Sequence, residues 1–86
     1  HWVIRAQAAK SLGLIGEPAA VEQLVLLVNG DSDYNVVLQS AVALARIQGG
    51  REALTQILDQ SRGDLAEKAV RYVLQEAVLT HLNFVQ

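Results

Sequence analysis

Histidines and cysteines are the residue types that most often bind metals, and this chain has few of them. Its two histidines, His1 and His81, lie near opposite ends of the sequence, and it has no cysteine. Phe84 and Val85 follow His81 at helical spacing, and neither can coordinate a metal. Without cysteine there are no thiolate sites and no disulfides. We therefore expect no metal and no other cofactor.

Residues 31–35, Asp-Ser-Asp-Tyr-Asn, look like the start of a calcium-binding EF-hand loop. Such a loop needs glycine at its sixth position for a sharp turn and glutamate at its twelfth for bidentate ligation. Those positions hold Val36 and Val42. Short polar side chains in front of an apolar periodic segment are also typical of helix caps. We expect residues 31–33 to cap a helix.

Acid–base and nucleophilic chemistry each have one candidate pair. Asp59 and Asp64 are close in sequence, but they flank a turn and are expected to lie in solvent and not in apolar surroundings. Ser11 and Ser40 are expected on the packed side of helices, with no histidine near them in sequence to act as a base. The glycines mark helix ends, so they form no phosphate loop. We expect no enzymatic activity.

Composition narrows the class of protein and of partner. The 86 residues allow one domain, and 51% of them are hydrophobic, mostly Ala, Val and Leu. The net charge of −2 comes from interspersed acidic and basic residues. Without a basic patch, nucleic acid is not an expected partner. No apolar run approaches the ~18 residues of a membrane span. No signal peptide is visible, so we expect a cytoplasmic protein.

An internal repeat organises the chain. In its first part the repeat has an offset of 32 residues, and three pairs carry it: Ala9 with Ala41, Leu12 with Leu44, and Ile15 with Ile47. Farther on the offset is 33, as in Ala20-Val21 with Ala53-Leu54 and Leu24-Val25 with Ile57-Leu58. The extra residue falls in the turn at residues 49–51, where repeat arrays tolerate insertions.

A third, degenerate copy follows. Leu65, Ala69 and Val73 have the spacing of Val36, Ser40 and Leu44, at an offset of 29. The repeats therefore span residues 3–29, 33–60 and 64–86 of a single domain, 1–86.

Helical periodicity and end signals predict five helices, over residues 3–15, 18–29, 34–47, 51–60 and 64 to 79 or beyond. Gly16 and Gly49-Gly50 should end helices, and so should Asn29-Gly30 by adopting a left-handed backbone. Pro18 should start the second helix, and Ser61 to Asp64 has the pattern of a capping box. The expected buried stripes are Ile4, Ala8, Leu12 and Ile15; Val21, Leu24, Val25 and Val28; and Leu54, Ile57 and Leu58.

Short loops make consecutive helices antiparallel neighbours. Each helix pair has an apolar face that only another pair can cover, so the pairs should stack. The predicted fold is all-α, a right-handed α–α superhelix or solenoid of two and a half helical hairpins.

Two motifs resemble HEAT-like repeats, in particular those named after phycobilisome lyases. One is Ala-Ala-x-x-Leu-x-x-Ile-Gly at residues 8–16, and the other is Ala-Val-x-x-Leu at residues 20–24. The second copy departs from the pattern, because Gln48 replaces the glycine and Gly49 supplies it one place late. The resemblance implies that the second helix of each hairpin lines a concave, partner-binding side.

On those second helices, spacing places six residues away from the core: Glu22, Gln23, Leu26, Thr55, Gln56 and Asp59. We expect a non-catalytic scaffold that binds another protein through them. The alternative implied by the resemblance is a segment of a bilin lyase subunit that holds a tetrapyrrole. Trp2 and Phe84 should cover the ends of the stack. We also expect weak self-association through exposed stack ends, and a chain that is a section of a longer protein.

Overall fold

The computed structural model describes residues 1–60 and 64–85, and the side chains of residues 1–60 and 64–76. Every element in this part of the chain is helical, which confirms the all-α prediction. The elements are α1 (Trp2–Ile15), a 3-10 turn η1 (Pro18–Ala20), α2 (Val21–Gly30), α3 (Tyr34–Arg46), α4 (Gly50–Gln60) and α5 (Leu65–Val85).

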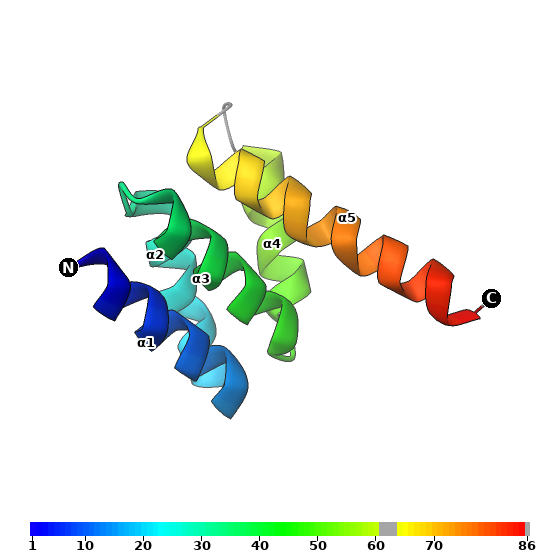
Figure 1. The fold of residues 1–86 in the computed structure, drawn as a ribbon, viewed down its shortest axis with the longest axis horizontal. Helices are drawn as coiled ribbons and strands as arrows, with labels where there is room; N and C mark the ends of the chain where they lie inside the picture. Colours follow the sequence, from blue (N-terminus) through cyan, green and yellow to red (C-terminus); the bar gives the residue numbers. More distant parts are fainter. Residues whose placement is uncertain (61–63, 86) are drawn as a thin grey trace.

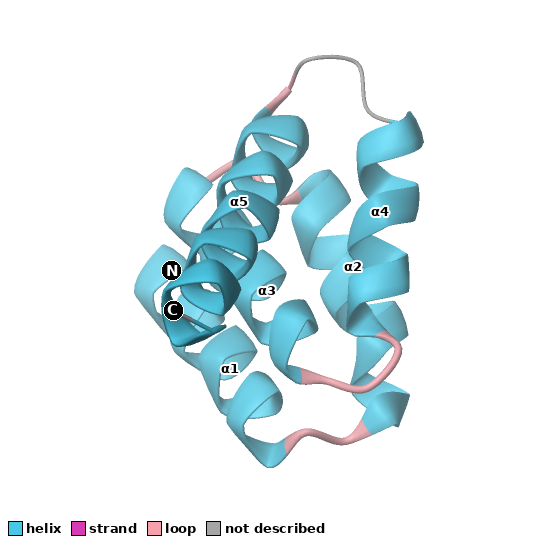
Figure 2. Cartoon of the chain, turned by 90° about the vertical axis from the view of Figure 1, so that its right-hand side faces the viewer, coloured by secondary structure: helices cyan, strands magenta, loops and turns pink. Residues whose placement is uncertain are grey.

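The helices form two layers. The first helices of the repeats, α1, α3 and α5, lie side by side, and the second helices, α2 and α4, lie behind them (Figure 1). Seen from the side, α2 and α4 make a separate layer joined to the first by short turns (Figure 2). This arrangement confirms the predicted open stack of helical hairpins.

Each of the two turns that follow α1 and α3 contains a glycine with a left-handed backbone. Gly16 and Gly49 have φ values of 75° and 87°, and they are the only described residues with positive φ. A left-handed backbone costs glycine little because it has no Cβ. The 33-residue offset that joins these two glycines is the one predicted from the late glycine of the second repeat.

The predicted helix starts are confirmed in part. The carboxylate of Asp33 accepts a hydrogen bond from the backbone N–H of Asn35 at 2.8 Å, and Asp64 accepts one from Glu67 N–H at 3.2 Å. Ser61 of the predicted capping box lies outside the described residues. Pro18 starts a 3-10 turn instead of the α-helix, which begins at Val21. Capping side chains therefore start the first helices of the later repeats.

The predicted left-handed end of α2 is wrong. Gly30 is the last helical residue, but its φ is not positive, and the following Asp31 is extended with ψ 140°. Asp31 is held there by its side chain, which pairs with Arg5. A tertiary contact, and not a glycine conformation, determines this helix end.

The core is centred on α3, which contacts α1, α2, α4 and α5. Its buried side chains include Val37, Ala41 and Leu44, each without solvent exposure. The buried stripes predicted for the second helices, α2 and α4, largely agree with the structure. Leu24, Val28, Leu54 and Ile57 are buried, while Val21, Val25 and Leu58 are half-buried against the same core. In the third copy Ala69 and Val73 are buried, but Leu65 is exposed.

The predicted buried face of α1 is wrong. Ile4 and Ile15 are 69% and 68% exposed, and Ala8 and Ser11 are also exposed. The first and second repeats match at these positions, but α1 is the outermost helix of its layer and has no neighbour on that side (Figure 1). Only Leu12 of the predicted stripe is half-buried. The periodicity identified the face that α3 turns toward α1.

Small residues make the actual contact between α1 and α3. The buried residues of α1 are Ala6, Ala9 and Gly13. A Cβ atom on Gly13 would lie 2.7 Å from both Cα and Cβ of Ala43 on α3, closer than such atoms approach. The two backbones are therefore close together, and this packing fixes the spacing of the first layer.

Candidate functional site

The six predicted binding residues all lie on the outer surface of the second layer. Glu22, Gln23 and Leu26 are exposed on α2, and Thr55, Gln56 and Asp59 are exposed on α4. Leu26 is 69% exposed, among the highest values of any large apolar side chain in the described residues. We call these six residues the second-helix surface.

The repeat relates the two halves of this surface. At an offset of 33, Gln23 corresponds to Gln56 and Leu26 to Asp59. Because α2 and α4 contact each other in one layer, the equivalent positions lie on neighbouring helices (Figure 2). The surface is thus a pair of matching rows and not a scatter of unrelated residues.

The chemistry of the second-helix surface is polar and weakly acidic. Glu22 and Asp59 supply its two charges, and it contains no basic residue. The Thr55 hydroxyl donates a hydrogen bond to the carbonyl of Arg51 on its own helix at 3.0 Å. Within the part of the chain that the structure describes, the other five side chains make no hydrogen bond or ion pair, so their polar atoms face solvent.

A groove elsewhere in the molecule was not predicted. It measures about 600 Å³ and lies between the C-terminal end of α3, the start of α4 and the middle of α5. Its lining residues are Val42, Ala45, Arg46, Arg51, Tyr72, Val73 and Glu76. Sequence spacing did not place Tyr72 beside Arg51, because the offset of 29 relates α5 to α3 and gives no relation between α5 and the start of α4.

The groove combines cations with apolar side chains. Arg46 and Arg51 lie on either side of the turn between α3 and α4, and neither is paired with another described residue. Glu76 on α5 partly balances their charge. This is the one place in the described chain where two unpaired arginines and an aromatic ring line the same hollow. The two arginines flanking Gly49-Gly50 were the available sequence signal.

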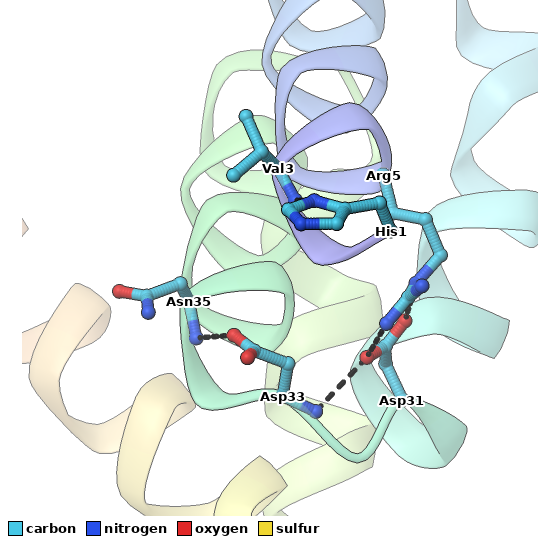
Figure 3. Close-up of polar contacts among 6 residues, drawn as sticks. All are labelled: His1, Val3, Arg5, Asp31, Asp33 and Asn35. Atoms are coloured by element: carbon cyan, nitrogen blue, oxygen red, sulfur yellow. Dashed lines mark hydrogen bonds and ion pairs between the residues drawn. The ribbon is translucent and has the colours of Figure 1, made fainter.

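The residues resembling a calcium loop have structural roles instead. The guanidinium of Arg5 donates two hydrogen bonds to Asp31, from Nε to Oδ2 at 2.7 Å and from Nη2 to Oδ1 at 3.1 Å (Figure 3). Asp31 also accepts the backbone N–H of Asp33 at 2.9 Å. The Arg5 hydrogen bond lowers the pKa of Asp31, although burial opposes the shift. Asp31 therefore ties α1 to the turn between α2 and α3.

The other residues considered for chemistry are not brought together. His1 Nδ1 accepts a hydrogen bond from the backbone N–H of Val3 at 3.3 Å and so caps α1 (Figure 3). The ring of Trp2 stacks on that of His1. Ser40 is buried, and its hydroxyl has no hydrogen-bond partner among the described residues. Ser11, predicted on the packed side, is exposed.

Three further predictions concern metals, membranes and the far end of the stack. In residues 1–60 and 64–85 no three His, Cys, Asp or Glu residues are grouped so that they could hold a metal ion. No described helix is long and apolar enough to cross a membrane. Phe84 lies outside the described side chains.

Comparison with known proteins supports the fold assignment. No curated protein and no solved structure matches the chain. A family model described as HEAT repeats matches residues 1–78, which include α1 to α4 and the larger part of α5. Together with the stacked helical hairpins, this match shows that the chain belongs to the HEAT-repeat family.

Proposed function

We propose that this chain is a non-catalytic interaction module that binds a partner protein through the second-helix surface. The observation that carries the proposal is Leu26, a leucine 69% exposed in the middle of α2. It lies among polar side chains whose equivalents on α4 are equally exposed. Protein interfaces commonly have an apolar centre with a polar rim, and Leu26 with its neighbours has that composition.

The second-helix surface is kept in place by buried residues on its own two helices, so it forms without a partner. Leu24 and Leu54 lie on the same helices as the exposed residues and are fully buried. A preorganised surface loses less entropy on binding than a disordered one. Because Glu22 and Asp59 are its only charges, a partner with basic or uncharged groups at the rim fits it best.

The test is partner capture by a triple variant, Gln23→Ala, Leu26→Ala and Gln56→Ala. All three side chains are exposed, so we expect the melting temperature to change little. Capture of the partner should fall at least about tenfold, as expected for loss of an interface centre. The matched control is Leu14→Ala, which removes a leucine 63% exposed on the first layer. Unchanged capture by the triple variant would rule out this surface.

The residues that could support the alternative, tetrapyrrole binding, lie in the groove and not on the second-helix surface. A propionate-bearing pigment requires cations or aromatic rings, and the second-helix surface has none. The groove lined by Arg46, Arg51 and Tyr72 has both. Incubation with phycocyanobilin should therefore give an absorbance shift that Arg46→Ala with Arg51→Ala abolishes if the chain is a lyase segment. An unshifted spectrum would rule out the tetrapyrrole alternative and leave the scaffold proposal as the remaining one.

A further inference from the structure

We propose that the groove between α3, α4 and α5 binds an acidic peptide segment, whose carboxylates pair with Arg46 and Arg51 and whose apolar side chain packs in the groove. The groove measures about 600 Å³, which is within the range of about 300–1,000 Å³ that is usual for ligand sites. None of the six residues of the second-helix surface lines it, and neither does Leu14. The proposal therefore rests on other residues than the proposed function does.

The repeat explains why a groove is present at this place. At the offset of 32, Gly13 of α1 corresponds to Ala45 of α3, and at the offset of 29, Ala43 of α3 corresponds to Tyr72 of α5. Gly13 and Ala43 are in close contact, whereas their two equivalents line the groove. Larger side chains at these positions keep α5 away from α3, and the two helices diverge toward their C-terminal ends (Figure 1). The groove is thus produced by side chains of this chain and is bounded by its helices on both sides.

The positive charge that has no partner on the protein is concentrated at this groove. Three of the basic side chains in the described part of the chain already have a partner there: Arg5, Lys68 and Arg71. The other three, Lys10, Arg46 and Arg51, make no ion pair with a described residue. Both arginines line the groove, and Lys10 lines a small hollow between α1 and α3 that shares Val42 and Arg46 with it. An incoming anion therefore meets cations that it does not have to take from another carboxylate.

The other lining residues indicate a peptide with both carboxylates and apolar side chains. The planar guanidinium group of arginine matches the geometry of a carboxylate. Between the two arginines and α5 the groove has apolar walls, which Val42, Ala45 and Val73 provide, and the ring of Tyr72, which is 52% exposed. A nucleic acid would need a broader basic surface, and Glu76 at the same groove would repel its closely spaced phosphates. Carboxylates separated by an apolar residue fit this surface better.

The test uses a fluorescein-labelled peptide in which single leucines separate pairs of glutamates, measured by fluorescence polarisation. We expect saturable binding below about 1 mM peptide, weakened several-fold between about 50 mM and 300 mM salt because the contact is electrostatic. Arg46→Ala with Arg51→Ala should weaken binding about tenfold or more. Lys68→Ala with Arg71→Ala is the matched control, since it removes the same charge from exposed residues outside the groove. Circular dichroism checks that each variant is folded.

Glu76→Gln tests the groove by a gain of affinity. Because Glu76 is the only acidic residue that lines the groove, its neutralisation should strengthen peptide binding several-fold. Glu22→Gln removes an equal charge from the second-helix surface and should leave peptide binding nearly unchanged. Weaker binding by Glu76→Gln, or an equal gain from both variants, would contradict a site at this groove.

Four further outcomes would overturn the proposal. They are no binding by the wild-type chain, an equal loss from the two double variants, equal binding of a peptide with serine in place of leucine, and tighter binding of an oligothymidylate of similar length. The last would indicate a nucleic-acid site. The triple variant Gln23→Ala, Leu26→Ala and Gln56→Ala should bind the peptide as the wild type does. Peptide binding and partner capture can therefore fail separately.

Discussion

At the scale of single residues, the Arg5–Asp31 pair links two parts of the chain that are 26 residues apart. The Asp31 side chain is 6% exposed and accepts three hydrogen bonds, two from Arg5 and one from the backbone of Asp33. An acceptor that is buried and paired in this way is costly to leave unpaired. The pair therefore helps to set the position of α1 on the stack.

Asp31→Asn should lower the free energy of unfolding by about 1 kcal/mol at pH 7, since Arg5 is partly solvated and its contribution is screened. Asp31 has a lowered pKa in the folded state. The contribution of Asp31 to the free energy of unfolding is thus complete above about pH 4, the usual pKa of an aspartate. It is lost as the pH falls through the lower pKa that Asp31 has in the folded state. Urea unfolding at pH 7 and pH 2 should show the difference between wild type and variant shrinking at low pH. Asp59→Asn, at an exposed position, is the control, and an equal difference at both pH values would contradict this account.

Residue-level prediction from the sequence succeeded where the signal was local. Gly16, Gly49, Asp33 and Asp64 act through their own turn or helix end, and the sequence predicted each position. The pairing of Arg5 with Asp31 was not predicted, because the two residues lie on different elements. Ser11 and Ser40 were both predicted on the packed side of their helices, and only Ser40 is buried, because α3 has a neighbouring helix on that side and α1 has none.

At the scale of elements, the packing of α1 on α3 depends on the absence of a side chain at Gly13. Gly13→Ala should lower the free energy of unfolding by about 1–2 kcal/mol, even though alanine favours helix by about 1 kcal/mol. The added Cβ would lie 2.7 Å from Ala43 and push the helices apart. Thermal and urea unfolding measure the effect.

Gly30→Ala is the matched control for Gly13. Gly30 is also helical, its φ is not positive, and nothing lies within 4 Å of an added Cβ. Alanine there should stabilise the chain by about 0.4–1 kcal/mol through the unfolded state. If both substitutions changed stability in the same direction, the close approach of α1 and α3 would not be an important constraint.

The faces of α1 show what periodicity can and cannot predict about an element. Helical spacing correctly identified Ile4, Ala8 and Ile15 as one face. It could not show that the face is uncovered, because coverage depends on how many repeats surround a helix. The groove beside Tyr72 was missed for a similar reason, since it depends on how three helices, α3, α4 and α5, come together.

At the scale of the whole molecule, α3 is the common neighbour of all the other helices. A chain of this size has a total stability of about 4–13 kcal/mol. Leu44→Ala should remove about 2–5 kcal/mol and destabilise all helices together, because Leu44 is fully buried at the centre. Circular dichroism in urea should show one transition at a lower midpoint. Leu14→Ala should change stability by less than about 0.5 kcal/mol, and a similar loss from both leucines would contradict a core centred on α3.

The most direct test of the account is photo-crosslinking of a partner from defined positions of the folded chain. A photoreactive phenylalanine at position 26 samples the second-helix surface, and one at position 14 samples an equally exposed site on the first layer. We predict that a partner protein crosslinks from position 26 and from position 56, and not from position 14. Equal crosslinking from position 14, or crosslinking from position 14 alone, would contradict the assignment of binding to the second helices.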